Sequence, residues 1–175
     1  MSELQHTHHT LSVQVENRPG VLTRVAGLFA RRGFNIESLA VGPTQDPTQS
    51  RITIRVDCSQ HSVDQVIKQL YKLIDVLKVQ ELGSSAVELE LLMIKVSSAP
   101  ERRPEIIGLA EVFEAKVVDV GPEAVTFSCV ASPDRLQALE ELLEPYGVRE
   151  LVRTGRIALD RDGSLGKRTR MRVVA

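Results

Sequence analysis

The order of the expected elements constrains this chain most, because the same order occurs twice within 175 residues. Apolar residues that alternate with polar ones predict strands, and apolar residues at three- and four-residue spacing predict helices. The first copy has strands at 11–16, 34–41, 51–58 and 76–82 and helices at 21–32 and 63–74. Strand, helix, strand, strand, helix, strand is the split βαβ pattern, a four-stranded antiparallel sheet with two helices on one face.

The second copy repeats this order after a small, flexible run at Gly83-Ser84-Ser85, which we interpret as the junction. Its strands are expected at 89–96, 115–120, 125–131 and 148–152, and its helices at 106–113 and 136–143. We therefore predict an α+β protein with two tandem ferredoxin-like βαββαβ domains. The expected divisions are a disordered tail at 1–10, domains at 11–83 and 84–160, and a basic tail at 161–175.

Several helix ends are marked by capping residues. Gly33 follows two arginines and is expected to stop the first helix in a left-handed conformation. Ser62 and Gln65 form a capping box before the second helix, whose apolar stripe is expected to run to Ile74. Ser132 is expected to cap the last helix.

Composition limits the classes of partner. Lys and Arg total 22 against 23 Asp and Glu, a net charge of −1, so no overall field attracts nucleic acid or an anionic membrane. No apolar run approaches the roughly 20 residues of a membrane span, and the polar start differs from a signal peptide, so we expect a cytoplasmic protein. Cys58 and Cys129 form no CxxC pair and are expected to be free, half-buried thiols.

The residues supply little for catalysis. His61 is the only histidine outside the N-terminal tail, and no nucleophile, dinucleotide-binding or P-loop motif is present. The tail histidines His6, His8 and His9 have no acidic or thiol partner nearby in the sequence, so a solvated tail is favoured over a metal site. Aromatic residues form 3% of the chain, and the central strands lack those that would stack RNA bases.

The turn Asn17-Arg18-Pro19-Gly20 before the first helix has a more specific capability. The first backbone N–H groups of a helix have no internal acceptor and can bind a carboxylate, such as that of a small amino acid. Sequence physics alone leaves two interpretations open, a ligand site and a purely structural turn. The second copy has Ser97-Ser98-Ala99-Pro100 at this point, so its turn lacks these residues.

The basic C-terminal segment also has two interpretations. It is either a solvated surface or a docking surface for an acidic partner. Its basic residues are Arg153, Arg156, Arg161, Lys167, Arg168, Arg170 and Arg172.

Several stretches together resemble one family. The turn 17–22 is followed by Arg32-Gly33-Phe34-Asn35-Ile36-Glu37-Ser38-Leu39, then by Pro43-Thr44-Gln45-Asp46-Pro47, and the chain later reaches Arg153-Thr154-Gly155-Arg156-Ile157-Ala158-Leu159. With these motifs the chain resembles the regulatory small subunits of acetohydroxyacid synthase, also called acetolactate synthase, which carry an N-terminal ACT domain. The resemblance covers nearly the whole sequence.

The resemblance implies a non-catalytic subunit that activates the catalytic subunit of acetolactate synthase. It also implies feedback inhibition by valine, or another branched-chain amino acid, in branched-chain amino acid biosynthesis. No cofactor is expected in this chain, because thiamine diphosphate, magnesium and FAD would belong to the catalytic subunit. Two classes compete with this interpretation, a free-standing amino-acid sensor that controls transcription or a different enzyme, and a small enzyme.

In the family, two ACT domains of a homodimer pair side by side with the amino acid between them. The motif match implies that one protomer supplies residues of the turn and the other supplies the start of the second strand. The residues implied to bind valine are Asn17, Gly20, Val21 and Leu22 from one protomer and Asn35 and Ile36 from the other.

Overall fold

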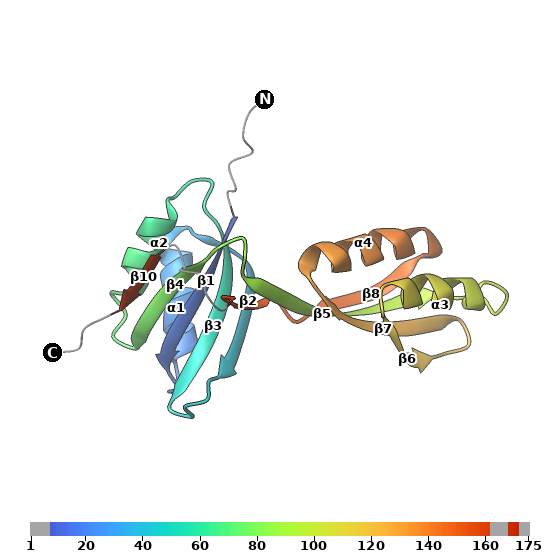
Figure 1. Ribbon diagram of the computed structural model, residues 1–175, viewed down its shortest axis with the longest axis horizontal. Helices are drawn as coiled ribbons and strands as arrows, with labels where there is room; N and C mark the ends of the chain where they lie inside the picture. Colours follow the sequence, from blue (N-terminus) through green and yellow to red (C-terminus); the bar gives the residue numbers. More distant parts are fainter. Residues whose placement is uncertain (1–7, 162–167, 172–175) are drawn as a thin grey trace. The chain divides into compact units, whose positions relative to one another are not determined.

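The structure is a computed structural model that describes residues 8–161 and 168–171. The chain forms two compact units (Figure 1), each described here by itself. The first comprises the residues up to Val87 together with those from Ile157 onwards, and the second comprises Glu88–Arg156. The boundary thus lies at 87/88, four residues after the expected 83/84, and the chain returns to the first unit at Ile157.

The first unit is a five-stranded antiparallel sheet in the order β10-β4-β1-β3-β2 with two helices. Its elements are β1 (His8–Glu16), α1 (Val21–Arg32), β2 (Asn35–Pro43), β3 (Gln49–Asp57), α2 (Val63–Leu70), β4 (Val76–Leu82) and β10 (Arg168–Met171). Strand β10 pairs with β4 and lies within the segment expected to be a basic tail, so that expectation was wrong for residues 168–171.

Alternation in the strands produces the core of the first unit. Leu11, Val13 and Val15 of β1 are at most 1% exposed, as are Ile52 and Ile54 of the neighbouring strand β3. They pack against the apolar faces of α1 and α2. The hydrophobic effect therefore fixes which face of the sheet the helices cover.

Strand β1 begins three residues before its expected start at Leu11. His8, His9 and Thr10 pair with the end of β3, and the His9 Nδ1 atom lies 2.7 Å from Glu81 Oε1 on β4. The prediction of a disordered tail was therefore wrong for these three residues, because β3 continues far enough to pair with them. Residues 1–7 of that predicted tail lie outside the described residues.

The two helices of the first unit end differently. Gly33 follows α1 with φ +69° and donates its N–H to Ala30, which confirms the expected left-handed cap. Helix α2 ends at Leu70, four residues before the predicted end, and Ile74 is 79% exposed. The Tyr71 hydroxyl accepts a hydrogen bond from the Val79 N–H at 2.9 Å, which ties the residue after α2 to β4.

The second unit has the same order of elements around a four-stranded sheet, β6-β7-β5-β8. Its elements are β5 (Val87–Ser97), α3 (Arg103–Val112), β6 (Lys116–Val120), β7 (Ala124–Ala131), α4 (Pro133–Leu143), the 3-10 turn η1 (Glu144–Tyr146) and β8 (Val148–Arg153). The next strand, β9 (Ile157–Leu159), belongs to the residue range of the first unit. The α+β class with two ferredoxin-like units is thus confirmed. Pro133 stands in the first turn of α4, but Ser132 makes no side-chain capping bond, which corrects its expected role.

Both cysteines are free thiols, as expected. Cys58 is partly buried, whereas Cys129 is 3% exposed and therefore more buried than predicted. Within the described parts of the chain, none of the helices is both long and apolar enough to cross a membrane.

Candidate functional site

The turn between β1 and α1 is held by backbone contacts on both sides. The Glu16 N–H donates to the Asp75 carbonyl at 2.9 Å, and the Asn17 N–H donates to the Thr48 carbonyl at 2.7 Å. The Asn17 side-chain amide donates to the Pro47 carbonyl at 2.9 Å. Asn17 thus joins the turn to the β2–β3 loop, and its side-chain oxygen can still accept a hydrogen bond.

The β2–β3 loop that supports this turn is itself ordered by hydrogen bonds. The Asp46 carboxylate accepts from the Thr48 N–H at 2.9 Å, from the Thr48 hydroxyl at 2.6 Å and from the Gln49 amide at 2.9 Å. The bonds from Thr48 hold the pKa of Asp46 below its ordinary value. The loop therefore gives Asn17 a fixed partner.

Helix α1 begins without a side-chain cap. Gly20 is its N-cap with φ +82°, a left-handed conformation that favours glycine, and the first turn contains no acidic residue. Val21 is buried at 4% exposure and anchors the turn, whereas Leu22 is 42% exposed. The end of the helix thus carries backbone N–H groups without intrahelical acceptors beside an exposed leucine, an arrangement that suits a carboxylate with an aliphatic side chain.

Two basic residues lie at this end of α1, and each pairs with a carboxylate. The Nε atom of Arg18, in the turn, is 3.0 Å from Glu16 Oε2. The Arg24 Nε atom is 2.7 Å from Asp75 Oδ2, and the Asp75 side chain is only 7% exposed. Sequence reasoning missed this pair, because 51 positions separate its two members. The only local signal was a basic residue in the first part of a helix, where the helix dipole disfavours a cation.

Asn35 and Ile36 lie at the opposite end of the sheet from the turn. Asn35 pairs with Asp57, which also pairs with His8 at the start of β1, whereas Glu16 at the end of β1 pairs with Gln49. Asn35 is exposed, and Ile36 packs partly buried against the core. One copy of the chain therefore does not bring the six predicted site residues together, and a single site can contain all of them only if two copies contribute.

At the equivalent helix start in the second unit, an arginine side chain binds backbone carbonyls of the same unit. Arg103, the first residue of α3, donates from Nη2 to the carbonyls of Gly121 and Pro122 at 2.9 Å and of Ser98 at 3.3 Å. The arginine thus occupies the space beside the helix end. The second unit thus differs from the first at this point in its contacts as well as in its turn sequence.

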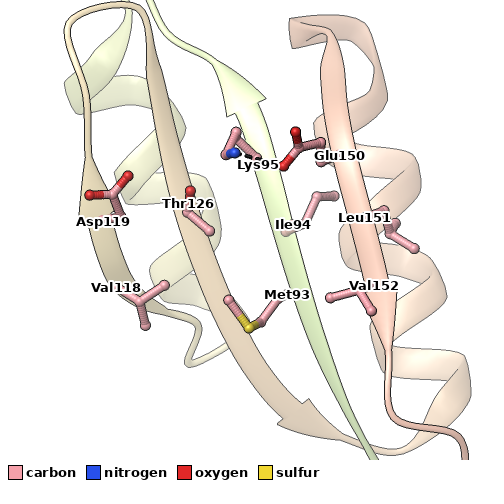
Figure 2. A pocket seen from close by; sticks show the side chains of 9 residues that line it. All are labelled: Met93, Ile94, Lys95, Val118, Asp119, Thr126, Glu150, Leu151 and Val152. Carbon is pink, nitrogen blue, oxygen red and sulfur yellow. Dashed lines mark hydrogen bonds and ion pairs between the residues drawn. The ribbon is translucent and has the colours of Figure 1, made fainter.

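The second unit also has a shallow groove of about 530 Å³ on the face of its sheet opposite the helices (Figure 2). Its polar groups include the ion pair between Lys95 and Glu150, at 2.6 Å, and Asp119. The pair holds the pKa of Glu150 below its ordinary value. Valine, leucine and methionine side chains form much of the remaining lining, so the groove offers apolar contact rather than acid–base chemistry. Its lining residues are Met93, Ile94, Lys95, Val118, Asp119, Thr126, Glu150, Leu151 and Val152.

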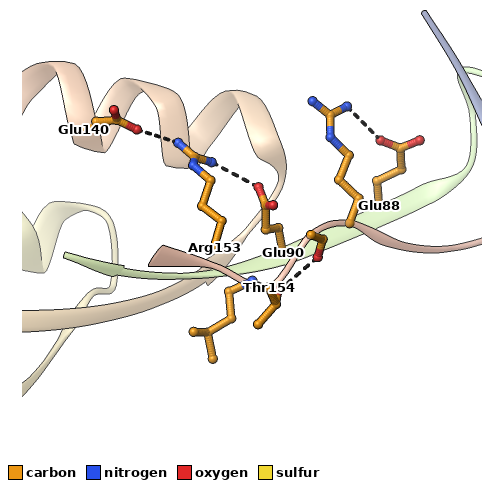
Figure 3. A network of polar contacts seen from close by, with 8 residues as sticks. Glu88, Glu90, Glu140, Arg153 and Thr154 are labelled. Atoms are coloured by element: carbon orange, nitrogen blue, oxygen red, sulfur yellow. Dashed lines mark hydrogen bonds and ion pairs between the residues drawn. The ribbon is translucent and has the colours of Figure 1, made fainter. Parts of the chain in front are cut away.

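Two arginines of the basic segment are structural (Figure 3). Arg153 lies between Glu90 and Glu140, with N–O distances of 3.0 and 2.7 Å, and Arg156 lies 3.4 Å from Glu88. Burial acts to lower the pKa of Arg153, but its pairs with Glu140 and Glu90 outweigh burial and raise the pKa above its ordinary value. Both arginines pair with carboxylates of their own unit. The two interpretations of the basic segment, a solvated surface and a docking surface, were therefore wrong for Arg153 and Arg156. Residues 162–167 and 172–175 of the basic segment lie outside the described residues.

Comparison with known proteins first identifies the class. Residues 11–78 match the family model of the AHAS small subunit-like ACT domain. The first unit is therefore an ACT domain, and its open helix end corresponds to the turn that sequence reasoning singled out. Residues 89–162 match the model described as the small subunit of acetolactate synthase.

Full-length relatives give the particular family. The chain is 50% identical over 153 residues to the probable acetolactate synthase small subunit of Archaeoglobus fulgidus, covering 87% of this chain and 96% of that protein. It is 47% identical to the acetolactate synthase small subunit of Mycolicibacterium smegmatis, covering 87% and 91%. The crystal structure of the acetolactate synthase small subunit from Thermotoga maritima matches with a TM-score of 0.81 at 39% identity, covering 88% of this chain and 97% of that chain.

The chain belongs to the family of acetolactate synthase small subunits. Membership confirms the resemblance seen in the sequence and supports a regulatory rather than a catalytic role.

Proposed function

We propose that this chain is the non-catalytic regulatory subunit of an acetolactate synthase, which activates the catalytic subunit and confers feedback inhibition by valine or another branched-chain amino acid. Thiamine diphosphate, magnesium and FAD are proposed to bind to the catalytic subunit, not to this chain.

The chemistry of the α1 start favours the carboxylate of an amino acid. The helix dipole contributes about 0.3–1 kcal/mol to the binding of an anion, so direct hydrogen bonds and apolar contacts must supply the rest. Leu22 offers an exposed aliphatic wall. Each buried methylene adds about 0.8 kcal/mol, which favours a branched aliphatic side chain over alanine but separates valine only weakly from leucine.

A second copy can complete the site through β2. This strand forms one edge of the sheet, and no strand pairs with its outer side in the described part of the chain. If the β2 strands of two copies pair antiparallel about a twofold axis, Asn35 of one copy lies near the Pro43 end of the other. That end of the sheet carries the turn at Asn17, because Pro43 pairs with Ser50 next to the end of β1.

This arrangement gives a mechanism for feedback. An amino acid bound between two ACT domains stabilises one relative arrangement of the two copies and so changes how the subunit holds the catalytic partner. A coupling free energy of about 1–3 kcal/mol would give a roughly 5- to 150-fold response.

Calorimetric titration of valine into the full chain and into Gly20→Asp tests the proposed site. The substitution adds a side chain at φ +82° and a negative charge where we place the ligand carboxylate. We expect binding to the parent chain and its loss in the variant, with circular dichroism showing that the variant is folded. If the parent binds neither valine, leucine nor isoleucine, or if the folded variant binds like the parent, the proposed site is wrong.

A further inference from the structure

The start of α1 combines features that are unfavourable without an anion. Its N-terminal N–H groups and helix dipole carry partial positive charge, its first turn has no acidic residue, and Arg24 adds a full positive charge. Local features that oppose stability tend to occur at functional sites. Asp75 already pairs with Arg24, so an anionic ligand would compensate what remains, the partial positive charge of the helix end.

A buried carboxylate fixes the position of Arg24. The Asp75 side chain, 7% exposed, lies 2.7 Å from Arg24 Nε, and the Asp75 backbone carbonyl accepts the Glu16 N–H. Asp75 is thereby fixed to the end of β1. Its carboxylate in turn orients a guanidinium that is itself 47% exposed and accessible to a ligand.

The Nη1 atom of Arg24 lies close to Gly20. A Cβ atom added to Gly20 would lie 3.2 Å from Arg24 Nη1. A guanidinium has five N–H donors in a planar fork, so Nε can bind Asp75 while the Nη groups bind a second carboxylate. The backbone conformation of Gly20 thus favours glycine at this position, and a side chain there would shift Arg24 Nη1 only by a few tenths of an ångström.

We infer that Arg24 recognises the α-carboxylate of the effector and that Asp75 is its positioning residue. This inference rests on the proposed function and deepens it by naming the group that selects a free amino acid. The site should therefore reject amides and esters of the same amino acid, which keep the aliphatic side chain and the ammonium but lack the negative charge.

Titrations of valine and valinamide into the full-length parent and Arg24→Lys test the inference. Lysine keeps a positive charge beside Asp75 but lacks the fork that serves two carboxylates. We expect valine to bind at least about tenfold more weakly to the variant, since a hydrogen bond between charged groups is lost, while valinamide changes little. The dissociation constant of valinamide divided by that of valine should therefore fall toward one in Arg24→Lys. Asp75→Asn should lower the same ratio.

Arg31→Lys is the matched control, because Arg31 lies in the last turn of the same helix. It should leave both dissociation constants unchanged. If Arg24→Lys weakens valine and valinamide equally, Arg24 has only a structural role; if it binds valine like the parent, Arg24 has no role in binding. Either result overturns the inference while the proposed function stands. A parent chain that binds no branched-chain amino acid would overturn the proposed function itself.

Discussion

At the scale of single residues, the ion pairs of the second unit differ in burial and therefore in their importance for stability. Arg153 neutralises Glu90, whose side chain is 6% exposed, whereas Lys95 pairs with Glu150, whose side chain is 72% exposed. Removing one partner of a buried pair leaves an unpaired charge with low access to water. Exposed pairs are screened and contribute little.

We therefore predict that Arg153→Met lowers the free energy of unfolding by about 3 kcal/mol, the low end for a broken buried pair, since the arginine itself is 24% exposed. Lys95→Met, the matched control, should have a much smaller effect. Urea denaturation of the full-length variants measures both. Equal losses of stability would show that burial of Glu90 does not determine the energetics.

The thiol of Cys58 should react slowly. Burial raises the pKa of Cys58 from its ordinary value of 9.0 to about 11, and the nearby carboxylates Asp57 and Glu81 act in the same direction. At pH 8 the thiolate fraction falls about a hundredfold for a rise of two pKa units. We expect iodoacetamide to alkylate Cys58 about a hundredfold more slowly in the folded chain than in urea, as measured by mass spectrometry.

The raised pKa of Cys58 also makes the free energy of unfolding depend on pH. Because the folded pKa of Cys58 lies above the ordinary value, its contribution is fully present below pH 9 and is lost as the pH rises toward 11. Equal alkylation rates in the folded and unfolded chains would contradict the burial of this thiol.

At the scale of elements, two serines precede helices in the same way but cap them differently. Ser62 Oγ accepts the Gln65 N–H at 3.3 Å, whereas Ser132 makes no side-chain capping bond. We predict that Ser62→Ala destabilises α2 by about 0.5–1 kcal/mol and that Ser132→Ala leaves α4 nearly unchanged. Amide hydrogen exchange at the first turns of the two helices measures this. Similar changes at both helices would show that the hydroxyl bond at Ser62 is unimportant.

Much of the fold was predictable because it depends on local periodicity. The alternation of Leu11, Val13 and Val15 fixed the buried face of β1, and Gly33 marked the end of α1. The end of α2 was missed because Ile74 continues the helical spacing, while the contact that ties Tyr71 to β4 is tertiary. Ser132 fits a capping pattern, but such a pattern does not determine where its hydroxyl points.

The candidate site was predictable only in part. The turn at Asn17 and Gly20 is a contiguous motif, and its backbone conformation follows from glycine. The Arg24–Asp75 pair joins residues 51 positions apart, and the Arg153–Glu90 pair joins residues 63 positions apart, so neither has a local pattern. Residues that long-range contacts bring together need the fold before they can be recognised.

At the scale of the whole molecule, the proposed site links effector binding to association of two copies. Because both copies are proposed to contribute residues, valine should tighten the dimer by the same factor by which dimerisation tightens valine binding. Sedimentation velocity over a range of protein concentrations, with and without valine, measures this linkage. Gly20→Asp is the control and should show no response to valine. Valine binding that leaves the dimer dissociation constant unchanged would contradict a site shared between copies.

We propose that this chain makes an acetolactate synthase sensitive to a branched-chain amino acid through the start of α1. The most direct test measures acetolactate formation by the catalytic subunit of the same organism, alone and mixed with the parent chain or Gly20→Asp, at increasing valine concentrations. We predict that both forms raise the activity without valine and that valine inhibits only the mixture with the parent. A catalytic subunit whose activity and valine response the parent leaves unchanged, or a Gly20→Asp mixture inhibited like the parent's, would contradict the claim.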